Sequence, residues 1–562
     1  MIPEKTLGIS LGHDSGVALL ENDQILFAAN EERFTRVKGQ SGFPFKSLGY
    51  LQKIGLADSL TRIAVDGKLV SPHGNDAKYR FEGNSGGLQG KAESLGLDAL
   101  FLGNKLGIHA MQAIYSVLHL EKRRRQIEFV REITRNREVA VHRVDHHIAH
   151  ASSIAFPGNP METGLVITLD GIGEGICSRV FRFNKGKLVK VGFTPALGSP
   201  ALMYGYATKI LGYRINRHEG KLTGLAAYGN AQITEGIFSK HFRYEKGKFK
   251  AVRIGYGIKA LNKLAQELHE FSPEDIAAGA QKVLEENVTS WIKDLTNRFN
   301  ESRLYLSGGA FANVKLNQRI AQLPSVTDLI ISPNMGDGGL ALGTAVSVHK
   351  QNLSLSSLYL GSNIKSYSET NHELELIYSG EDFHELIARM IAEKKIVAIA
   401  RGRMEYGPRA LGNRSILYSA KDTHVNQWLN KMLNRTEFMP FAPTCRDVDC
   451  KRNFLLDLPI DRYKHMTVTC DVTEFCKETA PAVVHVDGTA RPQIVFRDDN
   501  PDLYKILECY SQYVDNPVVV NTSFNMHEEP IVRTEQEAIS ALKRSNIDYL
   551  LLGNQLYRNS LN

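Results

Sequence analysis

Short apolar runs separated by polar, glycine-bearing turns dominate the first part of the chain, a pattern typical of strands in an α/β fold. The apolar positions between residues 5 and 20 predict two strands around a turn at residues 12–16, and residues 24–30 predict a third strand. Further strands are expected at residues 166–169, 304–306 and 329–332, and helices at residues 46–62, 97–139 and 274–299.

Three of these strands end in glycine-flanked polar turns that lead towards helices. The turns begin at Asp170, Ser307 and Pro333. The helices after the second and third turns are expected to run to residue 317 and to about residue 350. Open α/β sheets bind ligands at the carboxyl ends of their strands, so we expect a site where these turns meet.

A serine-rich stretch at residues 350–372 marks the predicted domain boundary. We assign residues 1–355 to a first domain, 356–372 to a linker and 373–562 to a second domain. The second domain shows another α/β pattern, with a helix near 382–394, a strand at 396–400, and strands around 482–486 and 517–520.

Composition narrows the class of protein. With 562 residues, 43% of them apolar, the chain is long enough for roughly three to four domain-equivalents, and it is not collagenous or mostly disordered. The 68 Lys and Arg against 61 Asp and Glu give a net charge of +7, too mild at this length to indicate nucleic-acid binding. With no transmembrane run, no signal peptide and no C-x-x-C pair among six cysteines, we expect a cytoplasmic protein with reduced thiols.

The histidine-rich segment at residues 145–150 is a candidate metal site. His146 and His150 stand four residues apart, so on a helix both imidazoles lie on one face, as a bidentate metal site requires. Asp170 and Asp337, each at a strand end, would complete the set of ligands. The alternatives are histidines satisfied within the core or at the surface, and aspartates that cap the following helices.

Two further patterns suggest phosphate binding. Glycine-bearing turns at residues 12–16, 171–175, 308–309 and 336–339 expose backbone N–H groups, and together they favour a nucleotide, although the usual nucleotide fingerprints are absent. Four arginines interleaved with glycines lie within 14 residues of the second domain: Arg401, Arg403, Arg409 and Arg414. Guanidinium groups bind phosphate oxygens through two hydrogen bonds; a solvated basic loop is the alternative.

Ordered motifs run along nearly the whole chain. In the first half they are Gly8–Gly16, Glu31–Lys38 with Phe43-Pro44, His146–Ser153, Thr168–Glu174, Glu219–Ala226 and Ser307–Ala310 with Asn313. In the second half they are Gly402–Ser415, His485–Thr489 with Arg491, and Asn521–Asn525. Taken together, these blocks resemble the O-carbamoyltransferase family, which includes the nodulation-factor, cephem-antibiotic and aminoglycoside (nebramycin-type) carbamoyltransferases.

The resemblance implies a mixed α/β protein with two catalytic modules. The first would be a two-lobed actin/hexokinase-like (ASKHA) domain similar to the tRNA threonylcarbamoyladenosine transferase, and the second a YrdC-like domain. By that similarity, the second module forms carbamoyl adenylate from carbamoyl phosphate and ATP, releasing phosphate and pyrophosphate. The first module then transfers the carbamoyl group to a hydroxyl of a small-molecule acceptor, a natural product or sugar, and AMP leaves.

The resemblance also implies roles for individual residues. One divalent metal, Fe(II) in preference to Mn, Mg or Zn, would be bound by His146, His150, Asp170 and Asp337. His13 or Asp14 would orient or deprotonate the acceptor hydroxyl. The nucleotide and phosphates would be bound by Gly12, Lys221, Gly224, Gly308, Gly309, Asn313, Gly338, Arg403, Arg409, Asn521 and Ser523. Adenylate formation would involve Arg414, Arg435, His485 and Arg491.

One block departs from the family pattern. Leu433 and Met439 stand where lysine and arginine are common, while Arg435 is retained. Two phosphate-binding cations are therefore absent from this block, or are supplied by Lys431 or Arg446.

The main alternative function is that of a tRNA-modifying threonylcarbamoyl-type transferase, based on the shared modules and on a basic segment at residues 122–137. Interleaved glutamates in that segment and the mild net charge make nucleic acid an unfavoured partner. A zinc protease is disfavoured because no glutamate stands between His146 and His150, and a non-enzymatic scaffold would leave the glycine turns and arginine loop unexplained. We expect no membrane partner; the acceptor and the oligomeric state stay open, with a homodimer as one option.

Overall fold

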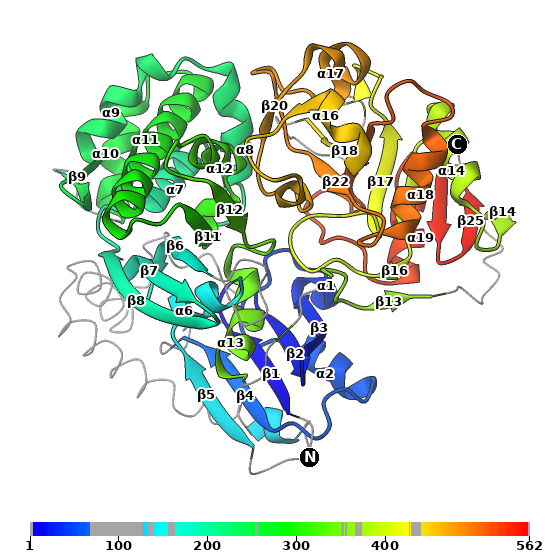
Figure 1. Cartoon of the computed structure of the whole chain (residues 1–562), viewed down its shortest axis with the longest axis horizontal. Coiled ribbons are helices and arrows are strands. Elements are labelled where there is room, and N and C mark those ends of the chain that lie inside the picture. Colours follow the sequence, from blue (N-terminus) through cyan, green and yellow to red (C-terminus); the bar gives the residue numbers. More distant parts are fainter. Residues whose placement is uncertain are drawn as a thin grey trace. The chain divides into compact units, whose positions relative to one another are not determined.

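The computed structural model describes residues 4–67, 128–132, 139–154, 163–252, 254, 257–349, 353, 357–365, 374–425, 428 and 440–559. The chain forms two compact units, Met1–Thr35 with Gly39–Leu355 and Arg36–Lys38 with Ser356–Asn562. Each unit is mixed α/β and has its own sheets (Figure 1). The α/β class expected from the sequence is confirmed, whereas the actin/hexokinase-like and YrdC-like assignments stay predictions.

The first sheet of the first unit has five strands in the order β3-β2-β1-β4-β5. The strands are β1 (Lys5–Ser10), β2 (Gly16–Glu21), β3 (Gln24–Asn30), β4 (Arg62–Asp66) and β5 (Ala140–Val144). The three strands predicted between residues 5 and 30 are confirmed. The helix predicted over 46–62 is shorter, because α2 (Phe45–Lys53) ends before Gly55, whose φ of 72° breaks the helix and lets the chain turn into β4.

The second sheet has the order β12-β11-β6-β7-β8. Its strands are β6 (Thr163–Gly173), β7 (Ile176–Asn184), β8 (Lys187–Pro195), β11 (Arg303–Ser307) and β12 (Asp328–Ile331). The prediction that the first of these strands stops at Asp170 is wrong, because β6 continues to Gly173. Its pairing with β7 shifts register between Leu169 and Gly173, so Asp170 lies in an irregular stretch where a side chain can be redirected.

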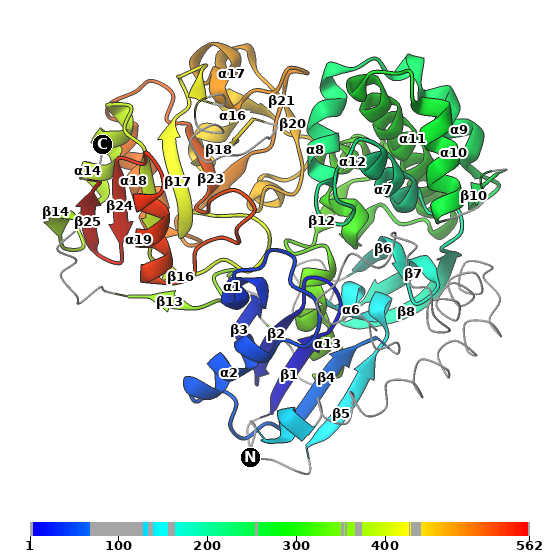
Figure 2. The same cartoon turned by 180° about the vertical axis from the view of Figure 1, so that it is seen from behind.

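The first unit also contains helices that pack on its sheets or on one another. They are α1 (Glu32–Thr35), α6 (His146–Ser152), α7 (Pro200–Ile210), α8 (Glu219–Leu225), α9 (Glu235–His241), α10 (Ile258–Leu268), α11 (Pro273–Phe299), α12 (Val314–Ala321) and α13 (Leu340–Val348). The long helix predicted over 274–299 is confirmed as α11, and α7, α9, α10 and α12 gather around it in both views (Figures 1 and 2). The helix predicted over 97–139 lies mostly outside the described residues, of which 128–132 are helical.

Helix α13 lies unusually close to α6 and β1. A Cβ placed on Gly343 of α13 would be 1.8 Å from the carbonyl oxygen of Ala149 in α6, and one on Gly8 of β1 would be 2.0 Å from that of Ala341. Only glycine permits such an approach of two backbones. This packing brings the start of α13, directly after Asp337, towards the helix that carries His146 and His150.

Gly343→Ala should therefore destabilise the first unit. The added methyl group has to push α13 away from α6, and overpacking of this kind costs ~1–3 kcal/mol of unfolding free energy. Urea unfolding followed by circular dichroism would measure the loss. Gly236→Ala in α9 is a matched control: a Cβ there meets nothing within 4 Å, so the higher helix propensity of alanine should leave stability equal or up to ~1 kcal/mol higher. An unchanged unfolding midpoint for Gly343→Ala would contradict the close packing.

The second unit is built on an eight-stranded sheet in the order β14-β25-β24-β15-β17-β23-β18-β22. The strands are β14 (Glu375–Ser379), β15 (Val397–Ala400), β17 (Arg414–Ser419), β18 (Ala442–Arg446), β22 (Gln493–Val495), β23 (Val519–Ser523), β24 (Tyr549–Leu552) and β25 (Gln555–Arg558). Helices α14 (His384–Ala392) and α18 (Pro501–Tyr510) pack together on this sheet over a buried apolar core, and α19 (Glu535–Lys543) precedes β24. A second, three-stranded sheet contains β19 (Phe454–Leu455), β20 (Cys470–Val472) and β21 (Thr489–Ala490).

Most elements predicted for this half are present. The helix near 382–394 and the strands at 396–400 and 517–520 are confirmed as α14, β15 and β23. The strand predicted around 482–486 is wrong: Pro481–Val483 form a 3₁₀ turn, whose Ala482 N–H donates to the carbonyl of Ala420. Short apolar runs after a proline pack as buried turns as readily as strands.

Three smaller findings concern the expected linker, the cysteines and the apolar length of the helices. Within the expected linker, β13 (Asn363–Ile364) pairs antiparallel with β16 (Gly402–Arg403). All six cysteines are buried and form no disulfide. Among the helices described, none is both long and apolar enough to span a bilayer.

Candidate metal and transfer site

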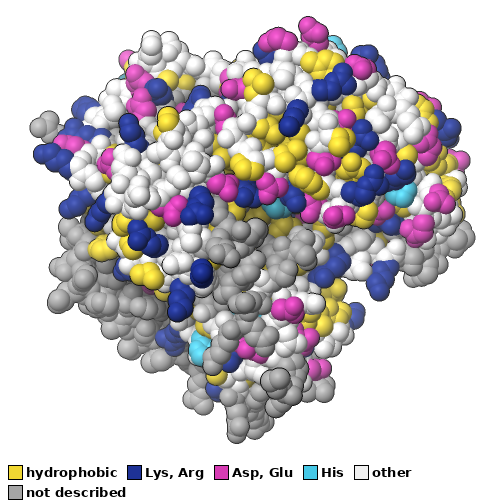
Figure 3. Space-filling view, viewed as in Figure 1, with side chains coloured by type: hydrophobic (Ala, Val, Ile, Leu, Met, Phe, Trp, Pro, Cys, Tyr) yellow, Lys and Arg dark blue, Asp and Glu magenta, His cyan; other side chains and the backbone are white. Residues whose placement is uncertain are grey.

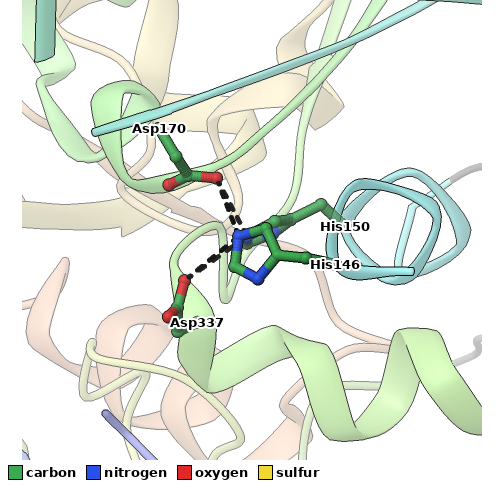
Figure 4. Close-up of side chains that lie close together, drawn as sticks. All are labelled: His146, His150, Asp170 and Asp337. Atoms are coloured by element: carbon green, nitrogen blue, oxygen red, sulfur yellow. Dashed lines mark ion pairs between the residues drawn. The ribbon is translucent and has the colours of Figure 1, made fainter. Parts of the chain in front are cut away.

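Four side chains of the first unit converge at one point (Figure 4). His146 and His150 extend from α6, Asp170 from the irregular end of β6, and Asp337 from the 3₁₀ turn that precedes α13. One ligand atom from each residue lies within 4.8 Å of the other three. The structure thus brings together the four residues expected to bind a metal.

The two imidazoles face both carboxylates. Nε2 of His150 is 3.0 Å from Oδ2 of Asp170 and 3.4 Å from Oδ1 of Asp337. Nε2 of His146 is 3.5 Å and 3.9 Å from the same two atoms. Figure 4 shows the two carboxylates approaching the imidazoles from different sides, as ligands around one ion would.

The chemistry of this cluster fits a divalent cation. Among the described residues, Nε2 of His146, Nε2 of His150 and Oδ2 of Asp170 are buried without a hydrogen bond of ordinary geometry. Buried polar atoms in that condition are rare and costly unless a ligand satisfies them. Two imidazole nitrogens and two carboxylate oxygens form a donor set that suits Fe(II), Mn or Zn.

The electrostatics lead to the same conclusion. Burial lowers the pKa of His150, but the Asp170 and Asp337 carboxylates outweigh burial and raise this pKa to about 10. Burial raises the pKa of Asp170, yet the neighbouring imidazoles of His150 and His146 hold it well below its usual range. Without a cation, the two carboxylates therefore favour a protonated His150 imidazole, and a bound cation has to displace that proton.

The start of α6 determines where its histidines point. Asp145 caps the helix, because its Oδ1 accepts hydrogen bonds from the N–H groups of His147 and Ile148, both at 3.1 Å. The same carboxylate lies 2.8 Å from Nη1 of Arg179 in β7. At the other end, the hydroxyl of Ser153 donates to the carbonyl of His150 at 2.8 Å.

The glycine turn after β11 positions Asp170. Oδ1 of Asp170 accepts a hydrogen bond of 2.5 Å from the N–H of Gly309. Gly308 has φ of 111°, and a Cβ there would be 2.4 Å from the carbonyl oxygen of Leu169. In this structure the turn therefore holds a carboxylate of the cluster, while the expected contact of Gly308 and Gly309 with a nucleotide stays a prediction.

The first turn of the chain also reaches the cluster. Nε2 of His13 lies 3.0 Å from Oδ2 of Asp337, and its Nδ1 lies 3.2 Å from Oδ2 of Asp14. A Cβ on Gly12 would be 3.5 Å from Oδ2 of Asp337, so this glycine lines the same space. Of the two residues expected to act on the acceptor hydroxyl, His13 thus lies beside a candidate metal ligand, and Asp14 lies beside His13.

Sequence reasoning missed one residue that connects these two turns. The side-chain amide of Asn30 in β3 donates to the carbonyl of Asp14 at 3.0 Å and to that of Gly338 at 3.2 Å. Asn30 therefore couples the turn bearing His13 to the turn bearing Asp337. No local pattern indicates this contact, because it joins segments far apart in the chain.

Other expected nucleotide-binding residues of the first unit have protein partners. Lys221 and Gly224 are buried in α8, and Nζ of Lys221 lies 5.9 Å from the centre of the Tyr213 ring. Asn313 caps α12 by accepting from the N–H of Leu316 at 3.0 Å and donates to Oε1 of Gln281 at 2.8 Å. Their contact with a nucleotide stays a prediction.

In the second unit, the arginine-rich loop is held largely by its own backbone. The Arg414 side chain is fully buried and donates at 2.7 Å to each of the carbonyls of Arg401 and Asn413. Nη2 of Arg403 donates to the carbonyl of Leu360 at 2.7 Å. Arg409, in the turn between β16 and β17, is partly exposed. Binding of phosphate by these guanidinium groups stays a prediction.

A buried carboxylate organises the same loop. Oε1 of Glu405 accepts hydrogen bonds from the N–H groups of Leu411, Asn413 and Arg414 at 2.7, 2.8 and 3.2 Å. Glu405 lies inside the motif that contains the arginines, so the signal was present in the sequence. The arginines and glycines around Glu405 in the sequence do not indicate that its carboxylate accepts hydrogen bonds from backbone N–H groups instead of binding a ligand.

The remaining expected residues lie on or next to the central strands. Asn521 of β23 donates to Oε1 of Gln493 at 2.7 Å, and the Ser523 hydroxyl donates to Oδ1 of Asn525 at 2.5 Å. Nδ1 of the buried His485 lies 3.3 Å from Oδ1 of Asp487. Arg491 stands between β21 and β22.

The block that departs from the family pattern lies mostly outside the described residues. Arg435, Lys431, Leu433 and Met439 lie outside the described residues. Arg446, considered as a replacement cation, is paired with Asp449 at 2.6 Å, which reduces its availability to a phosphate.

Comparison with known proteins defines the class. The family models for the carbamoyltransferase N-terminus and the carbamoyltransferase C-terminus match residues 5–346 and 388–559. The chain therefore belongs to the carbamoyltransferase family and is an enzyme of that class, which confirms the resemblance found in its motifs.

Several relatives match most of its length. An uncharacterized protein of Methanocaldococcus jannaschii is 32% identical over 98% of this chain and 99% of its own. The nodulation protein NolNO of Sinorhizobium fredii is 28% identical over 97% of this chain and 79% of its own length. The 3'-hydroxymethylcephem-O-carbamoyltransferase of Streptomyces clavuligerus is 27% identical over 60% of this chain and 64% of its own length. The match to a solved structure, the activator of the 2-hydroxyisocaproyl-CoA dehydratase from Clostridium difficile, covers 61% of this chain and 93% of that chain at 15% identity. Its TM-score of 0.33 does not establish a shared fold.

Proposed function

We propose that this carbamoyltransferase is an ATP-dependent O-carbamoyltransferase that works through carbamoyl adenylate. The second unit would form the adenylate, and the first would transfer the carbamoyl group to a hydroxyl of a small-molecule acceptor. The observation that carries this proposal is the cluster of His146, His150, Asp170 and Asp337 with His13 beside it. One unit thereby offers both a place for a phosphate-binding cation and a group able to take a hydroxyl proton.

The proposed reaction balances with one water molecule. Carbamoyl phosphate, ATP and water give carbamoyl adenylate, phosphate and pyrophosphate. In the transfer step the acceptor oxygen forms a bond to the carbamoyl carbon, the bond from that carbon to the adenylate oxygen breaks, and AMP leaves. The proton of the acceptor hydroxyl has to be removed as its oxygen attacks.

The residues of the first unit divide the transfer step between them. His13 or the partly exposed Asp14 would receive the hydroxyl proton, and Asp337 would hold the His13 ring through its Nε2. The four ligands of the cluster would bind a divalent cation, which supplies Lewis-acid stabilisation and a template for the adenylate phosphate. The glycine turns near the cluster carry no side chains, so they would let the phosphate of the nucleotide come close to the protein backbone.

Within the second unit, we propose that the partly exposed Arg409 and Arg491 neutralise phosphate charge, with Arg403 and Arg435. His485, Asn521 and Ser523 would orient carbamoyl phosphate or ATP. Two of these residues, Asn521 and Ser523, share β23 with backbone pairing to β17, which gives them a rigid support.

The test is a pair of assays on the metal-loaded full chain. AMP should form only when carbamoyl phosphate, ATP and a hydroxyl acceptor are all present, and a screen of acceptors by mass shift would identify the substrate. Without acceptor, labelled pyrophosphate should exchange into ATP when carbamoyl phosphate is supplied. Folded, metal-loaded protein that shows no exchange would contradict the two-step mechanism.

The tRNA-modifying alternative is less well supported. On the face shown in Figure 3, Lys and Arg side chains are intermingled with Asp and Glu side chains. A nucleic-acid interface instead gathers basic side chains on one surface and binds with a steep negative dependence on salt. Titration with tRNA at two salt concentrations tests this alternative, and we expect no salt-dependent binding.

A further inference from the structure

His147 lies between two candidate metal ligands but makes its contacts elsewhere. Its side chain is fully buried, its Nδ1 is 2.8 Å from the hydroxyl oxygen of Thr168, and its Nε2 is 3.2 Å from the carbonyl oxygen of Gly173. A second carbonyl, that of Ile176, is 3.3 Å from the same Nε2. The imidazole of His147 in α6 is therefore within hydrogen-bonding distance of Thr168 in β6, of Gly173 at the irregular end of β6, and of Ile176 at the start of β7.

We propose that His147 is a positioning residue for the candidate metal centre: it ties α6, which bears His146 and His150, to the segment of β6 that bears Asp170. This inference rests on the proposed cation site. It assigns to His147 no contact with the metal or with substrate, only the spacing between two sets of ligands.

The hydrogen bonds of His147 determine where its ring hydrogen lies. Carbonyl oxygens only accept, so Nε2 carries the hydrogen and donates it towards Gly173 and Ile176. Nδ1 is then an acceptor, and the Thr168 hydroxyl can donate to it. Both ring nitrogens are thereby satisfied by protein atoms, which leaves neither available to a cation.

The partners of His147 flank Asp170 on both sides. Thr168 precedes Asp170 by two residues, and Gly173 follows it by three. The stretch between them is the irregular one, where the pairing of β6 with β7 shifts. Two hydrogen bonds at its ends, made by a single ring, therefore hold the part of the strand that regular pairing does not.

Gly173 shows how tightly this joint is packed. A Cβ there would lie 2.3 Å from Cδ2 of His146 and 2.8 Å from Nε2 of His147. Real side chains do not approach to such distances, so the strand reaches the two rings only because residue 173 is glycine. The rings of His146 and His147 therefore both lie close to the backbone of Gly173, so a shift of that backbone would affect both.

A second link runs parallel to the first. The cap residue Asp145 pairs with Arg179 of β7 at 2.8 Å, and the backbone N–H of Arg179 donates to the Thr168 hydroxyl oxygen at 2.9 Å. Thr168 is therefore shared by His147 and by the strand that Asp145 contacts. Groups that hold metal ligands in this manner typically contribute 10–100-fold to metal affinity.

The test measures metal binding by the full chain, with Mn²⁺ and Co²⁺ as probes. His147→Phe keeps the ring but removes both hydrogen bonds, whereas His147→Gln keeps an N–H donor and an acceptor. Thr168→Val removes the hydroxyl at constant shape, and Thr168→Ser is its matched control. Free Mn²⁺ measured by electron paramagnetic resonance gives Kd, the Co²⁺ absorption spectrum reports ligand geometry, and thermal unfolding without metal reports stability.

We expect His147→Phe to raise the Kd for Mn²⁺ by about 10–100-fold and to change the Co²⁺ spectrum. Thr168→Val should also raise the Kd for Mn²⁺ and change the Co²⁺ spectrum, but to a smaller extent than His147→Phe. This variant keeps the inference testable if His147→Phe does not fold. His147→Gln should recover most of the affinity, and Thr168→Ser should match the original protein.

Two contrary results are distinguishable. If His147→Phe or Thr168→Val lowers only the unfolding temperature, with Kd and the Co²⁺ spectrum unchanged, the role of His147 is merely structural and the inference is overturned. If the original chain binds neither ion, or binds them as well after Asp170→Asn, the proposed cation site itself fails, and the role of His147 fails with it.

Discussion

Asp170→Asn should abolish carbamoyl transfer while leaving adenylate formation intact. Asparagine keeps an oxygen for the N–H of Gly309, so the local fold is retained. It removes the charge that faces the imidazoles of His146 and His150, and with it one ligand of the cation. Since Asp170 is the first of the groups that raise the pKa of His150 to about 10 against the effect of burial, that pKa should fall as well.

The expected loss of transfer activity is at least ~100-fold, with a comparable loss of Mn²⁺ affinity. Chemically prepared carbamoyl adenylate and an identified acceptor measure the transfer step, and pyrophosphate exchange measures the other half-reaction. His269→Ala, which changes a histidine with 68% of its side chain exposed, is the control and should change neither. If Asp170→Asn instead reduced exchange and transfer equally, the proposed division of labour between the two units would be wrong.

Arg414→Ala should unfold or strongly destabilise the second unit. The guanidinium is fully buried and donates to the carbonyls of Arg401, Gly402 and Asn413, which would be left without these donors. Removing one member of a buried, charged hydrogen-bond network costs ~3–5 kcal/mol, which corresponds to a fall of roughly 10 °C in the unfolding temperature. Loss of pyrophosphate exchange should accompany that fall.

Calorimetry and the exchange assay on the same sample separate two roles for Arg414. Arg497→Ala, at a guanidinium 60% exposed and paired with Glu508, is the control and should shift the unfolding temperature by about 3 °C or less. A folded Arg414→Ala protein with an unchanged unfolding temperature but no exchange would show that the guanidinium binds phosphate, as its position in the motif first suggested.

Local patterns predicted much of the fold. The short apolar runs on either side of the turn at residues 12–16 located β1 and β2, the run at 24–30 located β3, and the helical pattern over 274–299 located α11. Predictions failed where tertiary contacts override local preference. The strand at 166–169 continues past Asp170 because β7 pairs with it again at Gly173, and the apolar residues after Pro481 form a buried turn.

The candidate site shows the same division. Spacing placed His146 and His150 on one helical face, but three histidines stand in that segment, and spacing alone does not exclude His147. Only the contact of His147 with Thr168 shows that it faces the sheet instead. Likewise, nothing local distinguishes an arginine that binds phosphate from one, such as Arg414, that binds backbone carbonyls, because a guanidinium donates equally well to both.

By itself, the sequence determined the family, the order of most strands and helices, and the residue types able to bind a cation. The tertiary structure alone decided that Asp170 and Asp337 meet at the imidazoles, and that Asn30 joins the two turns beside them. The physical reason is that side-chain periodicity reflects neighbours within one helix or strand. Proximity between distant segments depends on sheet order, register and close backbone packing, such as that of Gly343 on Ala149.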